Sequence, residues 1–371
     1  MNMSNLLELN RAVLRGTSGG KILFQPRILC WIADRKFLGE PLPGGLDGLS
    51  DAQIYRNLGC SNRIYEYNAC FRQVLPGSVH TYSREISPME RETVIETPVG
   101  KLTTVMRGNT SNPGWFFEKW PVVTEDDLKV QMWLVEHTDW AFDRAVYDAV
   151  YAEWGDIGLP VMFTWPRVTV QNLYHDLMGV EAGVYALMDY PETVEKYFTA
   201  LNENALRLMD VINASPLEWV NFGDNLHGGT LSPKLFEKYV LPAYQQRCER
   251  LHRAGKFVFS HWDGDCKPLL PYAKHCGLDG IEAITPIPQG DVTLEEMKDA
   301  LGDEVFLVDG IAAVLFEDTF PVEALVEQVH RVIELFAPRL ILGISDEMPS
   351  RGNIERVRLV TQIVEEYNRG K

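Results

Sequence analysis

Short apolar runs alternate with longer amphipathic stretches from residue 161 to residue 367, and this alternation is the strongest constraint on the fold. The short runs have the length and composition of buried strands, whereas the stretches between them repeat apolar residues with helical spacing. This pattern favours a parallel sheet, because each parallel pair of strands needs a crossover connection that a helix supplies. The expected strands are Ile22–Phe24, Val161–Trp165, Trp219–Phe222, Phe257–Ser260, Gly280–Ile284, Val305–Val308 and Leu340–Ile344.

A further strand near the middle of the chain, which the sequence does not resolve, would bring the total to about eight. The expected helices cover residues 169–178, 191–211, 232–254, 268–276, 294–301, 322–336 and 353–367. The predicted fold is therefore a (β/α)8 TIM barrel with an N-terminal extension, formed as a single domain over residues 1–371. A doubly wound open sheet is the competing fold, but no glycine-rich nucleotide loop follows any of the expected strands.

Residues 81–107 have a different pattern from the rest of the chain. Two segments of high β propensity, Glu92–Thr97 and Lys101–Met106, flank the turn residues Pro98-Val99-Gly100. Two such segments joined by a short turn are typical of a β-hairpin. We expect this hairpin to decorate the barrel.

Charge and composition exclude several classes of protein. The chain has 35 Lys and Arg residues against 52 Asp and Glu residues, and the resulting net charge of −17 opposes binding to nucleic acid and to anionic membranes. No apolar run approaches the ~18 residues of a membrane span, and Met1–Arg15 lacks the apolar core of a signal peptide. The six Cys residues form no CxxC pair, so neither a zinc ribbon nor a disulfide framework is indicated. We expect a cytoplasmic protein, and its oligomeric state, a homodimer included, stays open.

Acid–base and metal-binding side chains follow several of the expected strands. In a TIM barrel the active site lies at the carboxyl ends of the strands. A single Asp after a strand is usually a helix cap or a turn residue, so it is the shared position of many such side chains that predicts a site. They are Asn221, Asp224, Asn225 and His227, then His261, Asp263 and Asp265, then Glu282, Asp309, Asp346 and Glu347.

The sharpest local feature is His261-Trp262-Asp263. In an extended segment, side chains two residues apart point to the same side, so the imidazole and the carboxylate could bind one Zn²⁺ with a third ligand from another loop. The alternative is a structural His261 that is hydrogen-bonded to Asp263. Trp165 and Trp262 also follow expected strands and could line an apolar pocket for a planar aromatic ligand.

Four segments between residues 177 and 264 carry patterns of a known family. They are Gly223-Asp224-Asn225 with the helix that begins Ser232-Pro233 and contains Phe236, Tyr239, Pro242 and Tyr244, then Leu177–Glu181, then Asp189–Glu192, and finally Val258–His261 with Gly264. In these patterns the chain resembles, over nearly its whole length, the uroporphyrinogen decarboxylase superfamily, which includes corrinoid-dependent methyltransferases.

The resemblance separates two branches of that superfamily. The decarboxylases carry a Met-Arg-Gln-Ala-Gly-Arg-Tyr motif near the first strand, whose arginines hold the carboxylates of the porphyrinogen. Here the region reads Leu29-Cys30-Trp31-Ile32-Ala33-Asp34-Arg35. A polyanionic tetrapyrrole needs such cationic contacts, so the absence of the motif disfavours a role in haem biosynthesis. In contrast, Glu96–Gly100 and Glu125–Lys129 resemble the methyltransferase branch.

Zinc methyltransferases of that branch resemble this chain at a His-X-Cys pair and at a later Cys near the last strand. Here the pair is His261-X-Asp263 and the later position falls near Ser345-Asp346-Glu347, so carboxylates replace thiolates. An oxygen-rich site suits the polarisation of an oxygen atom, such as that of an aryl methyl ether. The resemblance thus implies an O-demethylating methyltransferase that passes a methyl group from a methoxylated aromatic to the Co(I) of a separate corrinoid protein, with zinc held by His261, Asp263 and Asp346.

Several other residues at the strand ends are assigned to catalysis or to substrate binding. Asp224, His227 and Glu282 are the predicted catalytic residues, which would orient the substrate or supply a proton. The predicted substrate-binding residues are Trp165, Asn221, Asn225 and Trp262.

Two other functions are compatible with the sequence. A cofactor-free decarboxylase of a tetrapyrrole or another small carboxylic acid would need cationic groups for the carboxylate, with Arg27, Arg35 and Arg167 as candidates. A non-catalytic barrel that acts as a binding subunit would hold no metal and turn over no substrate.

Overall fold

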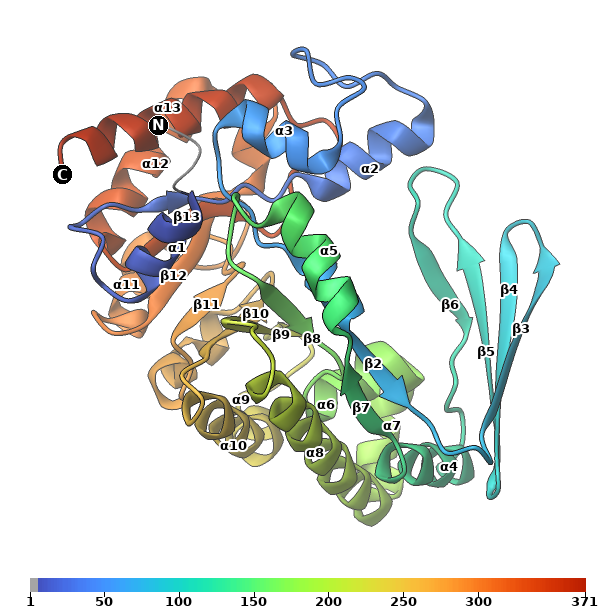
Figure 1. Ribbon diagram of the computed structural model, residues 1–371. Helices are drawn as coiled ribbons and strands as arrows, with labels where there is room; N and C mark the ends of the chain where they lie inside the picture. The colour runs from blue at the N-terminus through green and yellow to red at the C-terminus, as the bar shows by residue number, and fades with distance from the viewer. Residues whose placement is uncertain (1–5) are drawn as a thin grey trace.

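Seven parallel strands form a curled sheet at the centre of the computed structural model, which describes residues 6–371 (Figure 1). The first five residues of the segment analysed for a signal peptide lie outside the described residues. The strand order is β1-β13-β12-β11-β10-β9-β8, and all seven strands that the sequence resolved are present. They are β1 (Leu23–Phe24), β8 (Val161–Thr164), β9 (Trp219–Leu226), β10 (Phe257–Trp262), β11 (Gly280–Glu282), β12 (Phe306–Ala312) and β13 (Leu340–Ser345).

Residues 61–64 join the two edges of this sheet. The backbone N–H of Ser61 donates to the carbonyl oxygen of Phe24 in β1 at 3.0 Å. Three residues later, Ile64 forms a parallel bridge with Pro160, directly before β8. An irregular segment therefore fills the eighth position between β1 and β8, so the expectation of an eighth strand near the middle of the chain was wrong. The predicted TIM-barrel architecture is confirmed in this form.

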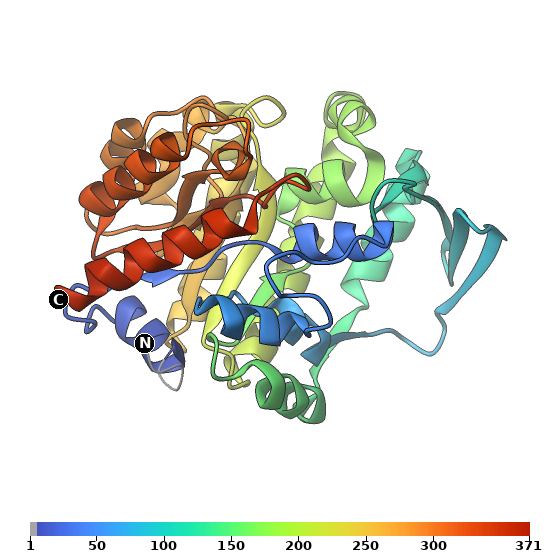
Figure 2. The same cartoon turned by 90° about the horizontal axis from the view of Figure 1, so that it is seen from above.

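Helices cover the outside of the barrel, as Figure 2 shows from above. The helices predicted at 294–301 and 322–336 have those bounds, whereas residues 267–275 form a 3-10 helix because Pro268 and Pro271 lack backbone donors. Among residues 6–371, no helix combines the length and the apolar character that a membrane span requires. The α-helices are α1 (Leu6–Leu14), α2 (Leu29–Leu38), α3 (Asp51–Leu58), α4 (Glu125–Glu136), α5 (Arg144–Trp154), α6 (Thr169–Asn172), α7 (Val180–Asp189), α8 (Pro191–Asn213), α9 (Pro233–Leu235), α10 (Leu241–His252), α11 (Leu294–Leu301), α12 (Val322–Phe336) and α13 (Ile354–Arg369).

Five segments of 3-10 or π-helix within residues 6–371 complete the connections. Two of them are π-helical and interrupt the helices predicted at 169–178 and 232–254. The π-helical turns are η3 (Leu173–Met178) and η4 (Phe236–Val240), and the 3-10 turns are η2 (Tyr65–Cys70), η5 (Lys267–His275) and η6 (Ala313–Phe316).

The side chains inside the barrel change in character from one end of the strands to the other. Alternate residues of a strand point to the same face, so every second residue faces inward. The layer at the amino end is an apolar interior cluster that includes Trp219, Phe259 and Phe306 together with Val13 and Leu14 from α1. The next inward positions of β9, β10 and β11 hold the buried polar residues Asn221, His261 and Glu282, which together are called the polar layer. The amino end is thus a packed core, and the chemistry-bearing side chains lie toward the carboxyl end.

The predicted hairpin is present, because the two segments expected at Glu92–Thr97 and Lys101–Met106 lie in paired antiparallel strands, which form the middle of a larger antiparallel sheet. This sheet stands out from the body of the molecule in both views (Figures 1 and 2). Near its base, the buried side chain of Leu102 and the close approach of Gly100 to Val130 pack it against α4. Its strands are β3 (His80–Ser87), β4 (Glu90–Thr97), β5 (Gly100–Gly108) and β6 (Trp115–Lys119), and a separate pair is formed by β2 (Phe71–Val74) and β7 (Asp139–Phe142).

Candidate functional site

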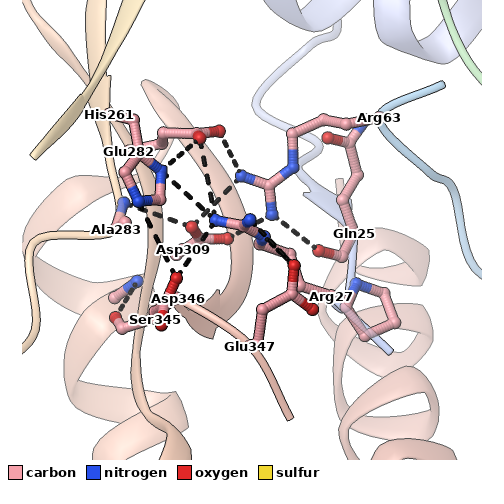
Figure 3. Close-up of polar contacts among 12 residues, drawn as sticks. Gln25, Arg27, Arg63, His261, Glu282, Ala283, Asp309, Ser345, Asp346 and Glu347 are labelled. Carbon is pink, nitrogen blue, oxygen red and sulfur yellow. Dashed lines mark hydrogen bonds and ion pairs between the residues drawn. The ribbon is translucent and has the colours of Figure 1, made fainter. Parts of the chain in front are cut away.

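A buried arginine lies beneath the polar layer, and it comes from the irregular segment that closes the barrel. Nη1 of Arg63 donates to Oε2 of Glu282 at 2.6 Å, and Nη2 donates to Oδ1 of Asp309 at 2.5 Å (Figure 3). All three side chains are at most 2% exposed. Charges buried this deeply are tolerated only when they are paired. Arg63 therefore links the carboxyl end of β11 to the middle of β12 inside the barrel.

Asp309 reaches Arg63 through a strained backbone. Val308 belongs to the apolar interior cluster, so the next side chain of a regular strand would point outward. At Asp309 the angle φ is +84°, in the left-handed region that side chains other than glycine rarely adopt. Ala283, Asn225 and Asp346 also have positive φ values, and each lies at or just after the carboxyl end of a strand. Strain of this kind concentrates at functional sites.

Glu282 is a carboxylate that orients His261. Burial raises the pKa of its carboxyl group, but the charges of Arg63 and Arg27 and the hydrogen bond with His261 outweigh burial and hold the pKa well below its usual range. Oε1 of Glu282 lies 2.7 Å from Nδ1 of His261. Since an ionised carboxylate can only accept, Nδ1 carries the proton, and the lone pair of Nε2 points the other way. A carboxylate–histidine pair of this kind is the usual outer support of a metal-binding imidazole.

Nε2 of His261 faces the two carboxylates of the predicted metal site. One ligand atom each from His261, Asp263 and Asp346 lies within 4.8 Å of the others, and the distance from Nε2 to Oδ1 of Asp346 is 3.7 Å. Two ligands each about 2.1 Å from a tetrahedral zinc ion lie about 3.4 Å apart. The three residues come from β10, from the loop after it and from the loop after β13. Their arrangement fits a zinc ion if the three ligand atoms move slightly closer to one another.

The charge balance around the three residues also favours a cation. Burial, followed by the nearby charge of Asp346, raises the pKa of Asp263. The surrounding cluster contains more carboxylates than guanidinium groups, so a divalent cation would reduce an excess of negative charge. The five carboxylates are Asp263, Glu282, Asp309, Asp346 and Glu347, and the two guanidinium groups belong to Arg27 and Arg63.

Aromatic side chains lie beside His261 inside the barrel. The ring of Phe163 in β8 packs edge-on against His261 at 5.9 Å and against Tyr65 at 5.1 Å, measured between ring centroids. The hydroxyl of Tyr65 accepts from Nδ2 of Asn221 at 3.0 Å and donates to Glu282 at 3.3 Å. The predicted substrate-binding residue Asn221 therefore supports the polar layer through Tyr65.

Phe163 occupies its position because residue 223 is glycine. A Cβ atom built on Gly223 would lie 1.9 Å from Cε1 of Phe163, which is a severe overlap. We expect Gly223→Ala to lower the free energy of unfolding by about 1–3 kcal/mol, the usual cost of overpacking a core. Chemical denaturation measures this change. Gly77→Ala is the matched control, because nothing lies within 4 Å of its added Cβ. Equal stability of the two variants would contradict the prediction.

Asp224, a predicted catalytic residue, lies on the helix side of β9. Its Oδ1 accepts from the backbone N–H of Val168 at 2.7 Å, and its Oδ2 accepts from the hydroxyl of Tyr244 in α10 at 2.6 Å. The side chain is fully buried, and burial raises its pKa. Both oxygens therefore hold the β8–α6 loop and α10 onto β9, away from the polar layer inside the barrel.

The other predicted residues are distributed around the open end. His227 lies against Gly264, next to Asp263, because a Cβ on Gly264 would be 2.7 Å from Cδ2 of His227.

Trp165 is 47% exposed after β8, and the guanidinium of Arg167 lies 4.8 Å from its ring centroid. Trp262 is fully buried and packs edge-on against Phe236, so its ring has no exposed face. Asn225 is less buried than Asp224, at a positive φ of 50°.

Sequence reasoning did not single out Arg63, Tyr65 or Phe163. Arg63 and Tyr65 belong to a region without helical or strand periodicity, and Phe163 reads as an ordinary strand residue. The one available signal is that Arg63 is the only charged residue between Arg56 and Glu66. A lone charge in an otherwise uncharged run is compatible with a buried, paired residue.

Comparison with known proteins gives the family of the chain. The family model described as uroporphyrinogen decarboxylase (URO-D) matches residues 173–367, which is more than half of the 371 residues. The chain belongs to the uroporphyrinogen decarboxylase family. The URO-D match includes the candidate metal residues, whereas Arg27 and Arg63 precede the matched segment. No curated protein matches the sequence.

Solved structures similar to this URO-D family member share its fold at low sequence identity. A methyltransferase from Methanosarcina mazei superposes with a TM-score of 0.58 at 13% identity, over 96% of this chain and 97% of that chain. A putative vitamin-B12 independent methionine synthase from Listeria monocytogenes gives a TM-score of 0.42 at 10% identity, over 94% of this chain and 96% of that chain. The first likeness shows a common fold over nearly the whole chain, and the second is too distant to support an argument.

Proposed function

We propose that this URO-D family protein is a methyltransferase that moves a methyl group from a methoxylated aromatic compound to the Co(I) of a separate corrinoid protein. The observation that carries the proposal is the group of His261, Asp263 and Asp346, whose ligand atoms lie within 4.8 Å of one another. The fold shared with the methyltransferase from Methanosarcina mazei supports this class of reaction.

The ligand set suits an oxygen-containing leaving group. One imidazole and two carboxylates form a harder site than thiolates do, and such a site prefers oxygen atoms. A zinc ion held by these residues would supply Lewis acidity toward an ether oxygen. In the overall reaction the bond between the methyl carbon and oxygen breaks, its electron pair stays on the oxygen, and Co(I) donates the pair that forms the new cobalt–carbon bond.

The residues of this chain prepare the site for that reaction. Glu282 fixes the orientation of His261 through the 2.7 Å hydrogen bond to Nδ1. Phe163 packs edge-on against His261, and Tyr65 packs against Phe163 and donates to Glu282. Of the predicted catalytic residues, His227 lies next to the loop that carries Asp263, where it would protonate the departing oxygen.

A direct assay tests the proposed reaction. The purified chain, loaded with zinc, is incubated under anoxic conditions with 2-methoxyphenol and free cob(I)alamin. We expect loss of the Co(I) absorbance, formation of methylcob(III)alamin and release of catechol in equal amounts. A reaction without the chain is the control. If a panel of methoxylated aromatics gives no methylcobalamin above this control, the proposed function is wrong.

A decarboxylase is the second candidate, and one of its three proposed arginines reaches the site. Nη1 of Arg27 lies beside the polar layer, 3.7 Å from Oε1 of Glu282. Arg35 instead packs over Trp31 and bonds to Glu40, and Arg167 pairs with Asp176. Release of labelled CO₂ from a carboxyl-labelled aromatic acid, without methylation of the corrinoid, would favour this second function.

A further inference from the structure

Arg27 places a positive charge directly beside the candidate metal residues. It follows β1, and its side chain is 13% exposed. Figure 3 shows its contacts with Glu282, Asp346 and Glu347. One side of its guanidinium is paired, because Nε and Nη2 lie 3.0 and 2.8 Å from Oε1 of Glu347. The other side, Nη1, faces the polar layer at 3.7 Å from Oδ1 of Asp346 and 3.7 Å from Oε1 of Glu282.

Nη1 of Arg27 makes no close hydrogen bond with these neighbours. The two carboxylate oxygens are too distant for a good hydrogen bond. Nδ1 of His261 lies at 3.3 Å, but it already carries the proton that it donates to Glu282, so it cannot accept a second one. The influence of Nη1 on the candidate metal residues is therefore mainly that of a nearby positive charge.

We propose that Arg27 weakens the binding of a divalent cation to His261, Asp263 and Asp346. This inference rests on the metal site of the proposed function. A cation among these ligand atoms would share Asp346 with the guanidinium, and the two positive charges would repel each other at short range. Glu347 holds the other side of Arg27 and keeps it at the edge of the site. The same charge would favour an anionic oxygen on the open side of the three residues.

If Arg27 instead strengthened metal binding, the expected change in affinity would have the opposite sign. Asp346 has a positive φ of 67° and its side chain is 41% exposed, so it depends on its neighbours for its position. If Arg27 acted chiefly by holding Asp346 in place, its removal would weaken metal binding. The sign of the change in affinity therefore separates the two roles.

Zinc affinity of the full chain, measured by competition with a chromophoric chelator, tests the inference. We expect Arg27→Gln to bind zinc roughly tenfold more tightly than the unmodified chain, because the repulsive charge is gone. Arg27→Lys keeps the charge and is expected to bind like the unmodified chain. Arg250→Gln is the matched control. Two nitrogens of Arg250 also contact one carboxylate, that of Asp210, at 2.6 and 2.5 Å, but this pair lies on the outer surface of α10.

A second comparison covers the case in which Arg27→Gln does not fold. The double variant Arg27→Gln/Glu347→Gln removes both partners of the pair and leaves neither charge unpaired. We expect it to bind zinc more tightly than Glu347→Gln alone. Unchanged or weaker binding when Arg27 is neutralised would overturn this inference but leave the metal site intact. Absence of zinc from every variant and from the unmodified chain would overturn the metal site together with the inference.

Discussion

Replacing His261 with alanine is expected to abolish zinc binding and to lower methyl transfer by more than ~100-fold, while the fold is retained. Loss of an outer partner of a metal ligand typically costs about 10–100-fold in affinity or activity, so loss of a ligand itself should cost more. The fold should survive, because Glu282 keeps its ion pair with Arg63 when its bond to His261 is removed. Zinc content and the rate of methylcobalamin formation measure the two effects.

The controls for this prediction separate the site from the fold. His330→Ala removes an exposed histidine of α12 that lies outside the polar layer, and it should keep both zinc and activity. Unfolding curves of His261→Ala establish that the chain is folded. Full methyl transfer by a folded, zinc-free His261→Ala variant would remove the metal from the proposed function.

Replacing Arg63 with methionine is expected to lower the free energy of unfolding by about 3–5 kcal/mol, the usual result of removing one partner from a buried ion pair. The variant would leave the carboxylates of Glu282 and Asp309 buried without their shared cation. The methionine side chain fills much of the space, so the loss reflects charge more than volume. Urea denaturation measures the change.

An exposed arginine provides the comparison for Arg63. Arg144 pairs with Asp148 on the surface of α5 at 2.8 Å, with both side chains more than half exposed. Such pairs contribute about 0–1 kcal/mol, so Arg144→Met should be nearly neutral. If Arg63→Met cost no more than Arg144→Met, the three-residue network would not hold β11 and β12 together as described.

The second half of the fold could be predicted because its strands are buried on both faces. Such strands read as continuous apolar runs, and the helices between them keep a clear period. The segment 61–64 has neither signal, so the sequence does not show that it closes the barrel or that Arg63 points inward. The outer strands β3 and β6 were missed for a related reason. Most residues of both strands are exposed on both faces of the projecting sheet, so no alternation marks them.

The rule that a TIM-barrel active site lies at the carboxyl ends of the strands located the candidate site, but it did not give the direction of each side chain. His261, Asp263 and Asp346 were predicted as metal ligands, and the structure brings their ligand atoms within 4.8 Å. Asp224 follows the same rule, yet it bonds to Tyr244 on the helix side of β9. Which face a residue takes depends on the phase of the strand and on its partner in a distant helix. Strain at Asp309 changes that phase locally, and no sequence signal marks it.

The packed amino end of the barrel has a consequence for the order of events in the proposed reaction. That end is closed by the packed side chains of Trp219, Phe259 and Phe306 and by α1. In the proposed reaction, the aromatic donor and the much larger corrinoid protein must then both approach the site from the carboxyl end of the barrel. The donor has to enter first, since a docked acceptor would cover the entrance, and the demethylated product leaves only after the acceptor departs. Excess acceptor should therefore inhibit turnover.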